Sequence, residues 1–171
     1  MKPAIRRAKG KSYEKKISEL LHKFIYENVV EYRELFDDIG NDNLKPKRDT
    51  SSGNFVNSDN DIDLGLAKKY FPFSIECKHH ASVGKMTITT IFKNDISFIR
   101  KTMKQAKTHA EKCKLIPLII MRGNYTSDIV IIENTSELLN KVTRCSTIIL
   151  VDDLIIVELN EFLKNYFSKY S

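Results

Sequence analysis

One stretch of sequence decides the fold of this chain: Asp61-Ile62-Asp63-Leu64 and, after ten more residues, Ile75-Glu76-Cys77-Lys78. Apolar and polar residues alternate over 61–67, and 73–78 is a second short run of strand-forming residues, so we expect two β-strands. The connection between them is short enough for a hairpin. With the turn near Tyr70, Asp63 would lie opposite Glu76, and their Cβ atoms would be about 5 Å apart.

Charged side chains on this hairpin would converge at one end. Successive residues of a strand point to opposite faces, so Glu76 and Lys78 share one face, as Asp61 and Asp63 do on the other strand. Two carboxylates this close repel each other unless a cation lies between them, and Mg²⁺ is commonly held by carboxylates, waters and phosphate oxygens. The pattern therefore suits metal-assisted hydrolysis of a phosphodiester, in which a neighbouring lysine assists.

The remaining segments carry helical and strand patterns. Apolar residues at helical spacing predict helices over 12–29, 94–114, 136–142 and 158–170, and solid apolar runs predict buried strands over 115–121, 129–132 and 148–151. Residues 87–92 fit either a third strand or the start of the following helix. Turn-forming residues make 37–60 a long loop. This order predicts an α/β fold in which helices flank a mixed central β-sheet.

The length of 171 residues suits one domain, with residues 1–11 as a basic arm and 122–171 as a C-terminal extension. Lys and Arg number 28 against 22 Asp and Glu, which gives a net charge of +6. This excess suits a nucleic-acid partner, although solvated surface charge explains it equally well. Three cysteines are too few for a disulfide scaffold, and no apolar run approaches the ~18 residues of a membrane-spanning helix. We therefore expect a cytoplasmic protein with reduced thiols and no membrane contact.

The spacing of Asp63, twelve intervening residues and Glu76-Cys77-Lys78 resembles the core of the PD-(D/E)xK nuclease superfamily, which has the restriction-endonuclease fold. Gly10-Lys11-Ser12-Tyr13-Glu14 is similar to the start of the first helix in archaeal Holliday junction resolvases and their phage relatives. Gln105 resembles the glutamine on the helix that follows the catalytic hairpin in many members, and the segment 48–53 is similar to an Arg and Ser-Gly segment of phage-type members. The chain departs from the family pattern at Ile62, where a proline is usual.

This resemblance implies a DNA endonuclease that uses Mg²⁺, with Mn²⁺ able to substitute, and that acts as a homodimer on branched DNA such as a Holliday junction. The catalytic residues that it implies are Glu14, Asp63, Glu76, Lys78 and Gln105. The metal ligands would be Asp63, Glu76 and Glu14, with Asp61 as a rival because it shares a strand face with Asp63. Two alternatives stay open: another nuclease of the superfamily with restriction, repair or nicking activity, and a non-catalytic nucleic-acid-binding module on the same fold.

Several residues near this site would contact the DNA backbone. They belong to the N-terminal arm, the long loop and the position after Lys78, and they are Arg6, Arg7, Lys9, Lys11, Lys47, Arg48, Ser52 and His79. A structural zinc site at His109 and Cys113, four residues apart on one helix, is a competing interpretation. A candidate dimer surface, which could equally pack on the chain's own sheet, consists of Leu154, Ile155, Phe162, Tyr166 and Phe167.

Overall fold

A computed structural model of the chain describes residues 3–39, 45–49, 61–80, 88–123 and 127–168. Its centre is a five-stranded sheet in the order β3-β4-β5-β7-β6, in which β3 and β4 are parallel and the other neighbours are antiparallel. The strands are β3 (Phe73–His80), β4 (Ile116–Gly123), β5 (Ile129–Glu133), β6 (Ile148–Val151) and β7 (Leu154–Glu158). This confirms the predicted α/β fold with a mixed central sheet, and it makes β3 an edge strand.

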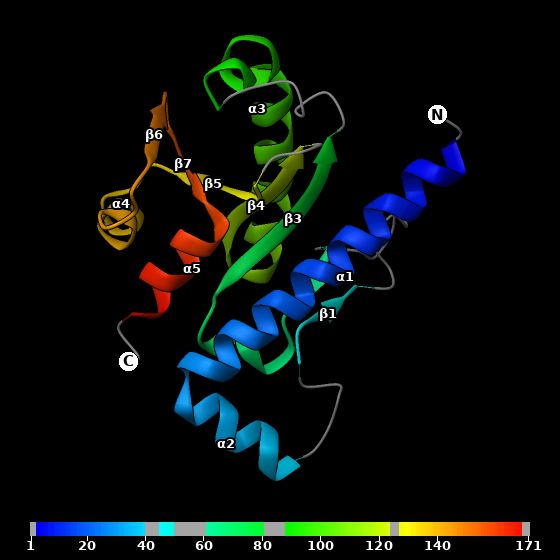
Figure 1. Ribbon diagram of the computed structural model, residues 1–171, viewed down its shortest axis with the longest axis vertical. Helices are drawn as coiled ribbons and strands as arrows, with labels where there is room; N and C mark the ends of the chain where they lie inside the picture. The colour runs from blue at the N-terminus through cyan, green and yellow to red at the C-terminus, as the bar shows by residue number, and fades with distance from the viewer. Residues whose placement is uncertain (1–2, 40–44, 50–60, 81–87, 124–126, 169–171) are drawn as a thin grey trace.

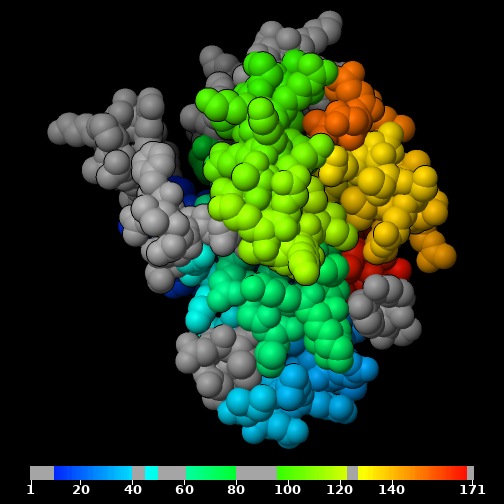
Figure 2. All heavy atoms as spheres, turned by 180° about the vertical axis from the view of Figure 1, so that it is seen from behind, coloured from blue at the N-terminus to red at the C-terminus, as the bar shows by residue number. Residues whose placement is uncertain are grey.

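Helices cover both faces of the sheet. The helices α1 (Pro3–Asn28) and α5 (Leu159–Phe167) lie on one face, and α3 (Ile88–Cys113) lies on the other. Figure 1 shows α1 running beside β3, and α3 forms the centre of the opposite face in Figure 2. Alternation along β4 explains the two layers, because Leu118 and Ile120 join the core under α1 whereas Ile119 and Met121 join the core under α3.

The apolar spacing of α1 fixes its position on the sheet. Ile17, Leu21 and Ile25 recur every four residues, and all three are fully buried. Residue 29 ends this stripe, after which α2 (Val30–Ile39) turns away and buries Tyr32. Among the described residues, every helix is too short or too polar to cross a membrane.

An aromatic cluster anchors the C-terminal helix α5 to the start of β3. Phe71 lies with its ring centroid 4.5 Å from that of Phe73 and 5.2 Å from that of Tyr166, and it stacks on Phe167. These side chains and Phe162 are at most 2% exposed. Leu154 and Ile155 are buried to the same extent. These residues are therefore part of the chain's own core, which confirms the alternative that the segment packs within the chain and contradicts a dimer surface there.

Several predicted elements differ from the structure. The helix expected over 12–29 begins at Pro3, so from that residue on the expected basic arm is the first part of α1. Residues 88–92 begin α3 and do not form a third strand. The segment expected to be a loop contains the end of α2 and a two-residue strand, β1 (Lys47–Arg48). The sequence prediction also missed β7, while α4 (Ser136–Val142) is confirmed.

We expect Phe71→Ala to lower the free energy of unfolding by about 3–5 kcal/mol, because it removes a fully buried ring from the aromatic cluster and leaves a cavity. Urea denaturation measures this change. The matched control is Leu150→Ala, at a side chain that is 55% exposed, which should change the free energy by no more than about 0.5 kcal/mol. Equal effects of the two substitutions would contradict this account of the core.

Candidate active site

The two charged side chains of the Glu-x-Lys sequence lie on the α3 face of β3. Glu76 is buried, with 3% of the residue exposed, and Lys78 is partly buried beside it. The Lys78 Nζ donates a hydrogen bond to the Glu76 Oε1. The other carboxylate oxygen, Oε2, lies 3.9 Å from the Nδ1 of His109 on α3. The predicted shared face of Glu76 and Lys78 is thus confirmed.

Asp61 brings a second carboxylate to this strand from outside the sheet. Its backbone N–H donates to the carbonyl of Ile75 at 3.1 Å, and its side-chain Oδ2 accepts the backbone N–H of Cys77 at 2.7 Å. These two contacts bind the outward-facing backbone groups on either side of Glu76. Asp61 therefore stands opposite Glu76, at the position that the hairpin model gave to Asp63.

Asp63 lies elsewhere, and the expectation that it faces Glu76 is wrong. In β2 (Ile62–Asp63) it pairs with Lys47 of β1, and β2 forms no ladder with β3. Its Oδ1 accepts the N–H of Gly65 at 3.0 Å, and Lys68 lies 3.6 Å from the same oxygen. The strand ends there because Gly65, at a φ of 53°, leads into a 3₁₀ helix (Gly65–Lys69). The prediction that Asp63 pairs with Glu76 assumed a regular hairpin, and the chain does not form one here.

Glu14 of α1 reaches the same region from the other face of the sheet. Its Oε2 accepts a hydrogen bond from the Arg48 Nε at 2.5 Å, and the negative charge of Glu14 acts on Asp61 and Cys77. Arg48, predicted to bind DNA, is thus held against a carboxylate of the site. The structure brings Glu14, Asp61 and Glu76 together with the two cations Arg48 and Lys78.

The other predicted residues are distributed around this cluster. Gln105 is exposed on α3, one helical turn before His109. Lys11 and Lys47 are exposed, and His79 lies against the Tyr13 ring at a centroid distance of 5.9 Å. The helix α1 contains Arg6, Arg7 and Lys9, whose side chains lie outside the described part of the structure, as does the whole of Ser52. DNA contact by these residues stays a prediction.

Sequence reasoning missed His109 as a neighbour of Glu76. It considered this residue only as a zinc ligand with Cys113, because a spacing of four places both on one helix face. Glu76 and His109 are more than 30 residues apart in the sequence, and no local pattern reveals their contact. The downstream glutamine of the family resemblance was the one available signal that this helix borders the site.

Burial and like charge make this cluster electrostatically strained. Burial, and then the charge of Glu76, raise the pKa of Asp61 to about 7, although the bond from the Cys77 N–H opposes them. Burial alone would lower the pKa of Lys78, but the charge of Glu76 and the hydrogen bond to it raise that pKa above its usual value. The lysine is therefore an ammonium group at neutral pH. Burial also raises the pKa of the Cys77 thiol, which makes it unreactive.

The donor set suits an oxygen-seeking cation held by few protein ligands. Within the described residues, no group of three or more His, Cys, Asp or Glu side chains is arranged to hold a metal ion. Among the described residues, three carboxyl groups nevertheless face two cations here, and Asp61 is the one without an ion pair. A site of two carboxylates, Asp61 and Glu76, completed by water or backbone oxygen, is the kind that Mg²⁺ occupies.

A comparison with known protein families identifies the family of this chain. A family model described as "Phage putative PDDEXK endonuclease" matches residues 5–170, nearly the whole chain. The chain belongs to this family. No curated protein and no solved structure matches the sequence. The match supports a nuclease of the PD-(D/E)xK superfamily.

We expect the Asp61 carboxyl to destabilise the metal-free fold increasingly as the pH rises from about 4 to about 7. The folded-state pKa of Asp61 lies above the unfolded value, so the protonated carboxyl favours folding below that range, and the benefit disappears once the group ionises beside Glu76. Asp61→Asn removes the charge but keeps an oxygen for the Cys77 N–H. Thermal melting in EDTA should therefore show this variant to be more stable than the wild type at pH 8, by an amount that shrinks toward pH 4.

The matched control for this comparison is Asp63→Asn. Its side chain is 40% exposed, and asparagine also forms the turn to Gly65, so its melting temperature should follow the wild type at every pH. A stabilisation at pH 8 in Asp63→Asn and not in Asp61→Asn would show that the wrong carboxylate has been placed beside Glu76.

Proposed function

We propose that this chain is a divalent-cation-dependent DNA endonuclease that acts on branched DNA, with Asp61, Glu76 and Lys78 at its reaction centre. The observation that carries the proposal is the placement of a second, partly buried carboxylate, Asp61, opposite the buried Glu76 on the edge of β3. Membership of the PD-(D/E)xK endonucleases supports nuclease chemistry at this site. The dependence on a cation and the choice of DNA are the additional steps of the proposal.

Asp61 and Glu76 would hold the cation, with Glu14 supporting the site through its charge. Mg²⁺ is the proposed ion and Mn²⁺ a substitute, since both accept carboxylate and water oxygens. The excess of carboxyl groups over cations among the described residues of the cluster, and the raised pKa of Asp61, support this assignment. When bound, the ion would polarise the phosphate and favour ionisation of the attacking water.

Lys78 contributes a fixed positive charge. An ammonium group cannot accept a proton from water, so a role as general base does not suit its raised pKa. Its hydrogen bond to Glu76 holds the Nζ at the edge of β3, from which it can orient the attacking water and stabilise negative charge developing on the phosphate oxygens. We assign it this electrostatic role.

The reaction is an in-line displacement at phosphorus. The water oxygen forms a bond to phosphorus while the bond to the 3′-oxygen breaks, the water loses its proton to solvent, and the leaving oxygen takes one up. The products are a 5′-phosphate and a 3′-hydroxyl, as the family resemblance implies. Gln105, one turn from His109 on α3, is proposed to support the site or to contact the DNA.

The preference for branched DNA rests on the resemblance of the Gly10–Glu14 segment to the junction resolvases. The position of Glu14 beside Asp61 supports this resemblance, because the first-helix glutamate then belongs to the site. A resolvase acts as a homodimer that cuts two strands, and we propose the same assembly for this chain. A restriction, repair or nicking enzyme on the same fold is the competing function.

We expect Asp61→Asn and Glu76→Gln each to lower the rate of DNA cleavage in Mg²⁺ by at least about 100-fold, because each removes a charge that the transition state needs. Asp63→Asn is the control and should stay within a few-fold of the wild type. Single-turnover cleavage of a radiolabelled substrate measures these rates. Full activity of Asp61→Asn together with inactive Asp63→Asn would overturn the assignment of the upstream carboxylate.

The substrate is tested with a synthetic four-way junction beside matched linear duplex, nicked duplex and single strand. Paired symmetric cuts in the junction, with at least about tenfold slower cutting of the linear forms, are the expected result. Cleavage without a junction preference would contradict the resolvase assignment but would support the assignment as a nuclease. Binding without cleavage of any form in Mg²⁺ or Mn²⁺ would identify a non-catalytic DNA-binding module.

A further inference from the structure

A second polar cluster lies on the face of β3 opposite to Glu76 and Lys78. Ser12, Tyr13 and Lys16 of α1 line a pocket of about 290 Å³ together with His79 of β3 and Arg122 of β4. His79 and Arg122 are paired residues near the ends of the two parallel strands. The pocket therefore lies between the N-terminal half of α1 and the ends of these strands, outside the proposed reaction centre.

The largely buried carboxylate of Asp128 holds the cations of this pocket in place. The Asp128 Oδ1 accepts a hydrogen bond from the Tyr13 hydroxyl at 3.0 Å, and its Oδ2 accepts one from the Lys16 Nζ at 3.0 Å. The Arg122 Nε lies 3.8 Å from the Oδ1. The Asp128 side chain is 11% exposed, whereas those of Lys16 and Arg122 are 50% and 38% exposed. The two cations are therefore exposed to solvent, and the carboxylate lies behind them.

The remaining donors of these cations are available to a ligand. Burial and the charge of Asp128 raise the pKa of Tyr13, so its hydroxyl stays protonated and keeps donating to Asp128. Among the described residues, Asp128 is the one acidic partner of Lys16 and Arg122. A guanidinium has five N–H groups and an ammonium has three, so most of them remain for an anion in the pocket.

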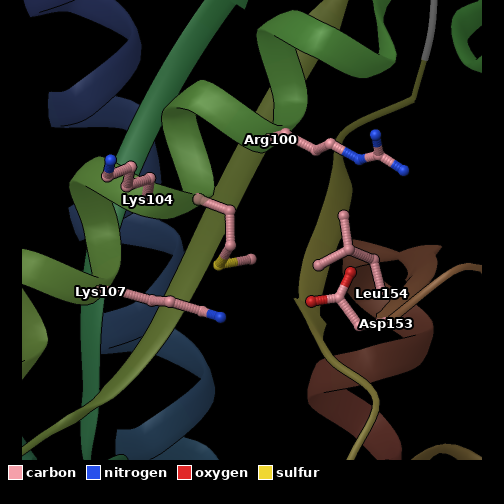
Figure 3. A pocket seen from close by; sticks show the side chains of 6 residues that line it. Arg100, Lys104, Lys107, Asp153 and Leu154 are labelled. Atoms are coloured by element: carbon pink, nitrogen blue, oxygen red, sulfur yellow. The ribbon is translucent and has the colours of Figure 1, made fainter.

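A comparison with a second pocket shows why this one suits an anion. A pocket of about 340 Å³ between α3 and the start of β7 also contains cations, Arg100, Lys104 and Lys107 (Figure 3). Arg100 forms an ion pair with Asp152, Lys107 forms one with Glu133 at 2.5 Å, and Asp153 lines the same pocket. Three carboxylates therefore match its three cations. The pocket at Lys16 and Arg122 has two cations for one carboxylate.

We propose that the pocket of Lys16, His79 and Arg122 binds an internal phosphate of the DNA strand that is being cut, at a position away from the scissile bond. This proposal rests on the proposed nuclease function. The pocket would hold the phosphate through the exposed side chains of Lys16 and Arg122, whose positions Asp128 fixes. A phosphate at a strand end would bind the same side chains, so the experiment distinguishes an internal phosphate from a terminal one.

The backbone connects this pocket directly to the reaction centre. Lys78 and His79 are consecutive on β3 and point to opposite faces, while α1 supplies Glu14 to one site and Tyr13 and Lys16 to the other. Consecutive Cα atoms are about 3.8 Å apart, so the two sites begin at neighbouring residues of β3. Successive nucleotides of a DNA strand rise by about 3.4 Å each, so a strand that passes the end of β3 can reach both sites within a few nucleotides.

The experiment measures DNA binding by fluorescence anisotropy, in Ca²⁺ without Mg²⁺ and over a range of salt concentrations, for Lys16→Gln, Arg122→Gln and the double variant. Each should bind more weakly, and each should lower the slope of log K against log salt by about 0.9, the value for one phosphate contact on duplex DNA. Because both residues would bind the same phosphate, the double variant should also lose about one contact. A loss of two contacts would overturn the single-phosphate pocket.

The charge-matched control is Lys69→Gln. Lys69 precedes the start of β3, roughly 20 Å along the strand from His79, and its ion pair with Glu31 is exposed on both sides. This variant should keep the affinity and the salt slope of the wild type. Melting temperatures of all variants check that folding is unchanged. Equal effects at Lys69 and Arg122 would show general charge attraction and overturn the pocket.

Chemical substitution of single phosphates then locates the contact. A neutral methylphosphonate at one internal position should weaken binding of the wild type and leave binding of Arg122→Gln unchanged. A preference for a 5′-phosphate end over a 5′-hydroxyl end that Arg122→Gln abolishes would assign the pocket to a strand end and overturn the proposal. Wild-type cleavage in Mg²⁺ is measured in parallel, so failure of the nuclease function is seen separately from failure of the pocket.

Discussion

The site depends on how the edge of β3 is completed. An edge strand carries unpaired backbone groups, and around Glu76 these are the Ile75 carbonyl and the Cys77 N–H. Asp61 binds both, one with its own backbone and one with its carboxylate. The contact that satisfies the backbone of the strand therefore also places a second negative charge beside Glu76. A regular hairpin would have used a backbone carbonyl instead, and no carboxylate would have been held there.

This arrangement has an electrostatic cost that the fold offsets only in part. Burial and the charge of Glu76 raise the pKa of Asp61 to about 7, and two cations, Lys78 and Arg48, each bind one of the other carboxylates. The two cations belong to β3 and β1, so the tertiary structure brings together the positive charges that balance Glu76 and Glu14. Because Asp61 has no ion pair among the described residues, a divalent ion would favour its ionised form beside Glu76, and the two carboxylates would orient the ion.

Local patterns predicted the strands and the face shared by Glu76 and Lys78, since alternation along a strand needs no knowledge of its neighbours. They failed where the backbone departs from regular strand geometry, at residues with positive φ. Gly65 ends the strand after Asp63, and this is the reason that Asp61 takes the expected place. The turn at Asp152, with a φ of 52°, allows a further strand, β7, that the sequence prediction did not separate from its surroundings. His109 reaches Glu76 only through the packing of α3 on the sheet, which depends on the whole chain.

The proposed reaction centre and the proposed phosphate pocket lie on opposite faces of β3. Alternation sends Glu76 and Lys78 toward α3 and the intervening and following residues toward α1, so a single strand must serve both layers. The helix α1 is shared in the same way, because Glu14 reaches the site whereas Tyr13 and Lys16 reach Asp128. A change in the position of α1 on the sheet would therefore displace both clusters together. Its stripe of fully buried residues, repeated every four positions, holds the spacing between the proposed phosphate pocket and the proposed reaction centre constant.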